Sequence, residues 1–270
     1  MILTSIASGS SGNSILISTE NRHFLVDAGV SRKRIVDTLR SLSVDPAALS
    51  GIFITHEHID HISGLGVFLR KYPVPVYATG KTIDQILGNS SVGQVDPSLF
   101  SSVLPDHPFQ VEGIRVEASR VLHDAADPVC YTFSDGREKA GIATDFGTFD
   151  DYLVEKMKGC SSLLVESNHD LNMLMVGPYP YPLKRRIMGN KGHMSNERAG
   201  QFLSKIIGED TRHVFLGHLS KENNYADLAY ETVKVELSLH GIDLDRHPVS
   251  LKIASRTEPT YSETKNIHQV

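Results

Sequence analysis

The segment ITHEHIDHISG, residues 54–64, decides how the rest of the chain is interpreted. It follows the apolar run GIFIT, residues 51–55, which predicts a buried strand. Its ligand-type side chains are His56, His58, Asp60 and His61. Alternate side chains of an extended strand diverge, so these residues can converge only on a tight loop. Imidazole and carboxylate bind zinc, iron and manganese alike. The motif therefore predicts a metal site in which two imidazoles bind one ion and the Asp–His pair points to a second.

The rest of the chain reads as strands and helices of one domain. Buried or alternating strands are predicted at 2–7, 14–18, 23–27, 51–55, 74–79, 109–113, 114–121, 129–135, 139–144, 163–167 and 213–217. Helices are predicted at 31–42, with Ser31 as N-cap, and at 62–71, 149–158, 195–207 and 225–239. Strands mixed with helices in two successive halves favour the α/β class, as a four-layer αββα sandwich. No Pro/Gly linker or repeat divides the chain, so we predict one domain over residues 1–257 and a polar tail over 258–270.

Composition indicates the class of protein and the cellular compartment that we expect for this domain. The chain has 270 residues, of which 40% are hydrophobic and 22% are charged, as in ordinary globular proteins. Cys130 and Cys160 are too few for a disulfide framework and lack metal-type spacing, which predicts buried thiols in a reducing compartment. The first residues do not resemble a signal peptide, and no apolar run is long enough to cross a bilayer. We therefore expect a cytoplasmic protein without membrane contact. The sequence does not indicate an oligomeric state.

Further landmarks make the chain resemble the metallo-β-lactamase superfamily. FLVDAG (24–29) contains Asp27, VLHDA (121–125) contains His123, GIATDFG (141–147) contains Asp145, and FLGHLS (215–220) contains His218. They occur in the order typical of that superfamily. The resemblance implies that His56, His58 and His123 bind one metal, that Asp60, His61 and His218 bind another, and that Asp145 bridges the two. It also implies that Asp27 supports the histidine loop and that Asp60 belongs to the catalytic centre.

Such a site implies a dinuclear hydrolase with two divalent ions, zinc by preference, with manganese and iron as alternatives. Two metals lower the pKa of a bridging water, so that metal-bound hydroxide is available as the nucleophile at neutral pH. Phosphodiesters, lactones, lactams and thioesters all suit this chemistry, so the substrate must be inferred from the surrounding residues.

Several polar segments are candidates for substrate contact. SGSSGNS (8–14) contains Ser8, Ser10, Ser11 and Asn13, which could face an anionic oxygen or simply form a flexible turn. ESNHD (166–170) contributes Glu166, Asn168 and His169, and for His169 a purely structural role is equally compatible. GHLSKENN (217–224) adds Lys221, Asn223 and Asn224. We predict Ser8, Ser10, Ser11, Asn13, Asn168, His169, Lys221 and Asn223 as substrate-binding residues.

The segment KGHMSNE, residues 191–197, points towards phosphate chemistry. By resemblance to nucleases of the superfamily, its His193 contacts the scissile phosphate and protonates the leaving group, although a helix-capping loop explains the motif too. Four cations lie nearby, namely Lys184, Arg185, Arg186 and Lys191. In a chain of net charge −5 they predict a local basic patch for the nucleic-acid backbone, with a solvated basic surface as the alternative.

Together these motifs resemble the YycJ/WalJ-like branch over nearly the whole chain. That branch implies a phosphodiesterase with 5′-to-3′ DNA exonuclease activity in DNA repair, acting on single strands or ends. A hydrolase of a small ester, lactone or cyclic phosphodiester would keep the same metal site, and a non-catalytic regulatory protein would be a third alternative. Strong salt dependence would favour the nucleic acid, and metal analysis would test the regulatory alternative.

Overall fold

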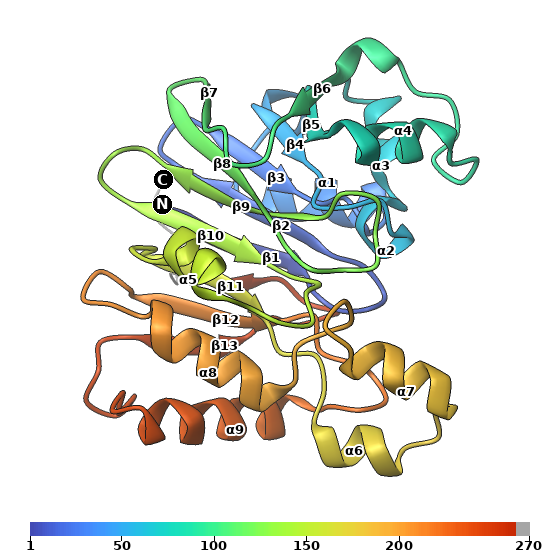
Figure 1. Cartoon of the computed structure of the whole chain (residues 1–270). Helices are drawn as coiled ribbons and strands as arrows, with labels where there is room; N and C mark the ends of the chain where they lie inside the picture. Colours follow the sequence, from blue (N-terminus) through green and yellow to red (C-terminus); the bar gives the residue numbers. More distant parts are fainter. Residues whose placement is uncertain (263–270) are drawn as a thin grey trace.

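The computed structural model describes residues 1–262, and within them the strands form two seven-stranded sheets packed face to face (Figure 1). The first sheet has the order β14 (Thr260–Tyr261), β1 (Ile2–Ala7), β2 (Ser14–Ser18), β3 (His23–Val26), β4 (Gly51–Phe53), β5 (Val76–Thr79), β6 (Phe100–Val103). The second has the order β13 (Ser250–Ile253), β12 (His213–Gly217), β11 (Ser162–Glu166), β10 (Lys139–Ala143), β9 (Val129–Ser134), β8 (Ile114–Arg120), β7 (Phe109–Val111).

Each sheet is half antiparallel and half parallel. In the first sheet the pairs from β14 to β3 are antiparallel and those from β3 to β6 are parallel. In the second, β13 to β10 pair in parallel and β10 to β7 pair antiparallel. The parallel strands need crossover helices, which lie on the outer faces of the sandwich.

The layers are held by three hydrophobic cores. Strand β2 shows how one strand serves two of them, because Ile15 and Ile17 face the second sheet while Leu16 faces the helices. Between the sheets, Phe53 packs edge-to-face against Phe133, with ring centroids 5.0 Å apart. This alternation explains why β2 is apolar at successive positions, since both of its faces are buried.

Helices cover both outer faces. The first sheet is covered by α1 (Arg32–Ser41), α2 (Ile59–Ile62), α3 (Leu65–Leu69) and α4 (Gly80–Gly88), and the second by α5 (Asp151–Met157), α8 (Asn196–Ile206) and α9 (Ala226–Leu239) (Figure 1). The side chain of Ser31 accepts a hydrogen bond from Arg34 N, which confirms it as the N-cap of α1. Two short helices, α6 (Leu171–Val176) and α7 (Tyr181–Met188), lie at one end of the sandwich. The predicted αββα architecture is confirmed. The chain also forms short 3₁₀ turns, η1 (Pro46–Ala48) and η2 (Pro97–Leu99).

Some predicted boundaries were wrong. Of the predicted helix 62–71, residues 65–69 form α3, while Ile62 ends the separate helix α2. The two helices are separated at Gly64, whose N binds Ala28 O at 2.8 Å and where a Cβ would lie 1.8 Å from Val30 O. The predicted tail at 258–270 begins too early, because Thr260 and Tyr261 pair with β1. The remainder of that tail, 263–270, lies outside the described residues. Helices α4, α6 and α7 and strands β6 and β13 were not predicted, since they are short or lack clear periodicity.

Candidate metal centre

The candidate ligands follow the ends of strands from both sheets. The histidine loop comes after β4, Asp145 comes two residues after β10, and His218 comes directly after β12. Asp145 and His218 have φ values of 58° and 53°, a left-handed conformation that is uncommon for residues other than glycine. Such conformations persist only where the surroundings hold them, and they turn the side chains sharply out of the strand direction. The strand ends thus direct distant residues to one place.

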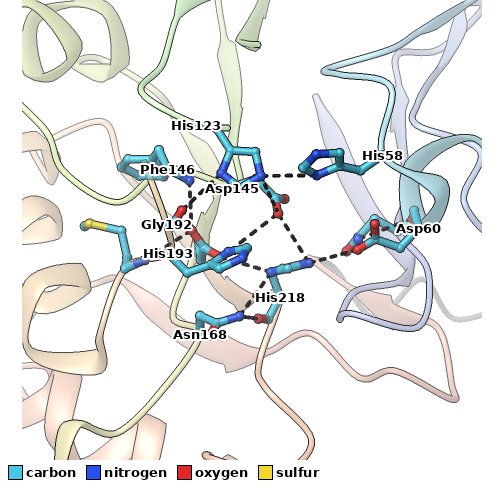
Figure 2. A network of polar contacts seen from close by, with 12 residues as sticks. His58, Asp60, His123, Asp145, Phe146, Asn168, Gly192, His193 and His218 are labelled. Atoms are coloured by element: carbon cyan, nitrogen blue, oxygen red, sulfur yellow. Dashed lines mark hydrogen bonds and ion pairs between the residues drawn. The ribbon is translucent and has the colours of Figure 1, made fainter. Parts of the chain in front are cut away.

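One group consists of His56, His58 and His123. Their ligand atoms lie within 4.8 Å of one another, and His123 Nε2 is 3.3 Å from His58 Nδ1. The Nδ1 atom of His123 is 3.1 Å from Gly192 O, so it carries the proton and donates it to that carbonyl. The other nitrogen, Nε2, is then left with a lone pair that faces the group (Figure 2).

A second group consists of Asp60, His61 and His218. Their ligand atoms also lie within 4.8 Å of one another, with 3.3 Å between His218 Nε2 and Asp60 Oδ2. The outer nitrogen of each histidine is held by a carboxylate. His61 Nδ1 is 2.7 Å from Asp27 Oδ2, and His218 Nδ1 is 3.0 Å from Glu166 Oε1. This carboxylate–histidine arrangement is typical of metal ligands, because it fixes the tautomer and the ring orientation.

Asp145 lies between the two groups (Figure 2). Its Oδ2 is 3.2 Å from His61 Nε2, and its Oδ1 is 3.9 Å from His123 Nε2. Burial alone would raise the pKa of Asp145, but the imidazoles of His218 and His61 outweigh it and hold the pKa well below its usual range. The carboxylate is therefore charged and close to both groups, as a bridging ligand would be.

The arrangement fits divalent cations. His56 Nε2 is buried and lacks a hydrogen-bond partner among the described residues. Buried polar atoms are normally paired, so an unpaired nitrogen that faces this cluster of nitrogen and oxygen atoms indicates that something else binds it. Imidazole and carboxylate ligands suit hard or borderline divalent ions.

Asp27 holds two residues of the histidine segment, Thr55 and His61. It is fully buried, and its Oδ1 accepts a hydrogen bond from Thr55 N at 2.8 Å in addition to its contact with His61. Burial is the largest influence and raises the pKa of Asp27, against the opposing effect of His61. Gly29 lets the loop approach, because a Cβ there would lie 1.7 Å from Asp60 O.

Glu166 and His193 extend the centre on one side. Glu166 Oε1 is 2.6 Å from His193 Nδ1, and Oε2 accepts from Phe146 N and Met194 N (Figure 2). Burial would raise the pKa of Glu166, but His193 and His218 outweigh it and lower it to about 2. The hydrogen bonds to Glu166 from His193, His218, Phe146 and Met194 favour a supporting role, and its carboxylate also lies within 4.8 Å of ligand atoms of Asp145, His193 and His218. The sequence contained only a weak signal for this role, a glutamate at the end of a buried strand.

His193 has one ring nitrogen that Glu166 does not occupy. Its Nδ1–H donates to Glu166, which leaves Nε2 available, and its side chain is 15% exposed while that of Glu166 is fully buried. Burial opposes the charged form, but Glu166 outweighs it and raises the pKa of His193. The ring stacks on His218 with centroids 5.2 Å apart, directly beside the two groups.

Most of the residues predicted to contact substrate are buried. Ser8, Asn13, Asn168, His169 and Asn223 are each at most 4% exposed. Ser8 Oγ accepts from His218 N at 2.8 Å, Asn13 Nδ2 lies 3.1 Å from His61 Nε2, and Asn168 Nδ2 donates to His218 O. Their burial and these contacts favour a supporting role over direct substrate contact, because spacing along the chain places a residue near a site without showing which side of the loop it faces.

The other two of these buried residues, His169 and Asn223, contact neighbouring loops through their backbones. Burial lowers the pKa of His169 to about 4, and its backbone pairs with the residues that begin α8. Asn223 O accepts from Asp170 N, which ties two loops together. Of the predicted substrate contacts, only Ser10, Ser11 and Lys221 are exposed.

The predicted basic patch is smaller than its sequence suggests. Lys184 is 9% exposed and donates to Met175 O and Gly177 O, and Arg186 binds Asp124 with two nitrogens. Arg185 and Lys191 are exposed and form no ion pair within residues 1–262. Two of the four cations are thus unpaired.

Cys130 and Cys160 are buried free thiols, as predicted.

No helix within residues 1–262 combines the length and the apolar content that crossing a membrane requires.

The chain is similar to proteins of known family and fold. A family model described as a beta-lactamase superfamily domain matches residues 22–219. The chain is 39% identical over 239 residues to exodeoxyribonuclease YycJ of Bacillus anthracis, with 87% of this chain and 89% of the relative covered. It is 38% identical over 233 residues to exodeoxyribonuclease WalJ of Streptococcus pneumoniae, with 86% and 87% covered. The crystal structure of the metallo-beta-lactamase fold protein YhfI from Bacillus subtilis superposes with a TM-score of 0.69 at 16% identity, covering 96% of this chain and 98% of that one.

Proposed function

This chain belongs to the metallo-β-lactamase superfamily as a YycJ/WalJ-type, metal-dependent hydrolase, and from this we propose that it is a dinuclear phosphodiesterase that degrades DNA as a 5′-to-3′ exonuclease. The observation that carries the proposal is the pair of three-residue groups with Asp145 between them and His193 alongside. The names of the two curated relatives support DNA as the substrate.

We assign the ligands as two sets joined by one bridge. One set is His56, His58 and His123, the other is Asp60, His61 and His218, and Asp145 spans them. When bound, divalent ions such as zinc would supply Lewis acidity, lower the pKa of water and neutralise the charge of the phosphate oxygens.

The chain's own residues position and protonate the substrate. In the hydrolysis, a water oxygen bonds to phosphorus and gives up a proton to the solvent, the bond from phosphorus to the leaving oxygen breaks, and that oxygen takes up a proton. His193 is placed to give it from Nε2, because its Nδ1–H is already donated to Glu166. Glu166 keeps the ring oriented and also holds His218, so that the proton donor and the ligand cluster stay in fixed relation.

The test is a substrate panel. Metal-reconstituted protein is incubated with single- and double-stranded DNA and RNA labelled at either end, together with a simple phosphodiester and a lactone. We expect release of nucleotides from DNA 5′ ends, inhibition by a chelator, and recovery on adding back zinc or manganese. Hydrolysis of the lactone alone would contradict the proposal, and digestion from 3′ ends would overturn its polarity.

A further inference from the structure

Helices α6 and α7 carry an unusual apolar surface beside the metal centre. Large apolar side chains on them are exposed to solvent, with Val176 86% and Tyr181 66% exposed. We define the α6–α7 surface by the exposed side chains of Leu171, Met175, Val176, Tyr181, Arg185 and Met188. Tyr181, Arg185 and Met188 are spaced by four and three residues, so they form one stripe along the outer side of α7. Exposed large apolar side chains on two consecutive helices are typical of interaction surfaces.

The charge of this segment is also distinctive. The chain contains 32 acidic residues, yet residues 171–196 contain none. Arg185 and Lys191 are exposed there and have no ion-pair partner within residues 1–262. A surface that combines apolar and aromatic side chains with unpaired cations, and that has no acidic group of its own, is complementary to a polyanion with flat apolar faces.

The α6–α7 surface is continuous with the rim of the centre. Arg186 of α7 binds Asp124, the neighbour of His123, with 2.5 Å between Nε and Oδ2. At the end of α7, His193 N donates to Ile187 O at 2.8 Å, so the helix leads directly into the loop of the proposed proton donor. Figure 1 shows α7 at the end of the sandwich with α6 beyond it. A chain that leaves the centre on this side would run across the α6–α7 surface.

We propose that the α6–α7 surface binds the single-stranded part of a nucleic-acid substrate, with a base stacked on Tyr181 and phosphates paired with Arg185 and Lys191. The proposal rests on the proposed function and adds to it the place where the substrate strand lies. Stacking on an aromatic ring is tolerant of sequence, as an enzyme that digests strands of any sequence requires. The cations bind the backbone and so hold successive phosphates in register with the centre.

The experiment compares two substrates in the same metal-loaded protein. One is a single-stranded 20-nucleotide DNA, and the other is bis(4-nitrophenyl) phosphate, which has a single phosphate and no neighbouring nucleotides. We expect Tyr181→Ala and Arg185→Ala each to lower the ratio of kcat/KM on DNA to that on the small diester about tenfold. Tyr181→Phe should restore the ratio, because it retains the stacking ring. Arg185→Ala should also reduce the slope of log affinity against log salt by about 0.7.

Matched controls come from exposed residues elsewhere. Arg40→Ala removes a cation from the last turn of α1, and Leu239→Ala removes an apolar side chain that is 74% exposed at the end of α9. Both should leave the ratio unchanged. An unchanged ratio in Tyr181→Ala and Arg185→Ala, with DNA still cleaved by the wild type, would overturn the α6–α7 proposal and leave the nuclease intact.

Two other results would also be decisive. If the wild type dimerised in sedimentation experiments and Tyr181→Ala made it monomeric without changing the ratio, the surface would bind a second copy and the proposal would fail.

If the wild type cleaved the small diester but no DNA, the proposed function would fail. Fluorescence anisotropy with the labelled 20-nucleotide strand then decides the α6–α7 proposal separately, since equal binding by wild type and Arg185→Ala would overturn it.

Discussion

Three histidines of the candidate centre each have one ring nitrogen held by a residue that is not an assigned ligand. His61 is held by Asp27, His218 by Glu166, and His123 by the carbonyl of Gly192. These contacts decide which nitrogen carries a proton, and therefore which nitrogen can bind a metal ion. The geometry of the candidate centre thus depends on residues that are not among the assigned ligands.

Replacing Asp27 tests this dependence. Asp27→Asn keeps the volume but removes the charge that holds His61 Nδ1–H. We expect metal affinity to fall about 10- to 100-fold, as for other changes to the partners of ligand histidines. Elemental analysis after dialysis against a dilute chelator measures the loss, and Asp45→Asn, in the N-cap of an exposed 3₁₀ turn, is the control. Equal metal retention by Asp27→Asn and the wild type would refute the supporting role.

Replacing His193 tests the proton donor. His193→Ala removes the ring but none of the seven assigned ligands, so we expect normal metal content and a decrease in kcat on DNA of about 10²-fold or more. His240→Ala is the matched control, because His240 is an exposed histidine whose Nδ1 contacts only the backbone of its own helix. A His193→Ala enzyme with wild-type turnover would remove this residue from the mechanism.

Among the elements, helices α6 and α7 are connected by the buried side chain of Lys184. The sequence favoured a surface role for this lysine, yet its ammonium donates to Met175 O and Gly177 O, at 2.6 and 2.8 Å. Terminal carbonyls of a helix otherwise lack partners, so a buried cation there completes the end of α6. The neighbouring Arg185 faces solvent instead.

Two substitutions separate these roles. Lys184→Met keeps the apolar stem but removes the donors, and we expect it to reduce the free energy of unfolding by about 1.5–3 kcal/mol. It should also increase amide hydrogen exchange in residues 171–188. Arg185→Ala is the comparison and should leave both quantities close to those of the wild type. Unchanged exchange in Lys184→Met would show that α6 does not depend on this contact.

For the whole molecule, the cores determine which groups can react. Cys130 lies in β9 and Cys160 precedes β11, and both belong to the core beneath the helices of the second sheet. Burial raises the pKa of each thiol from 9.0 to about 12. The thiolate is the reactive form, so both cysteines are protected from oxidation in the folded state.

The same shift makes stability depend on pH. Above pH 9 the unfolded chain loses the thiol protons while the folded chain keeps them to about pH 12, so the unfolded state binds fewer protons and stability falls as pH rises across this window. At pH 10, ionisation of each thiol in the unfolded chain should lower the free energy of unfolding by roughly 1–1.5 kcal/mol. Urea unfolding at pH 8 and 10 measures this, and a Cys130→Ala, Cys160→Ala variant should lose less stability between the two. An equal loss in both proteins would contradict the assignment.

Much of this protein was predictable because the relevant information is local. The spacing of His56, His58, Asp60 and His61 after a buried strand indicated a metal loop without any knowledge of the fold. Periodicity identified the main strands and the helices α1, α5, α8 and α9, because the alternation of buried and exposed positions is imposed by each element's own geometry. The residue types and their order along the chain were enough to identify the superfamily, which the family match bears out.

Only the tertiary structure decided how polar residues divide between the centre, its supports and the surface. His218 and Asp60 are 158 positions apart in sequence yet 3.3 Å apart in space. Ser8 and Asn168 resembled substrate contacts but are buried against the backbone of His218, and Lys184 turned inwards while Arg185 remained outside. The physical reason is that a side chain's burial and partners depend on which distant segments pack beside it, and local spacing does not contain that information.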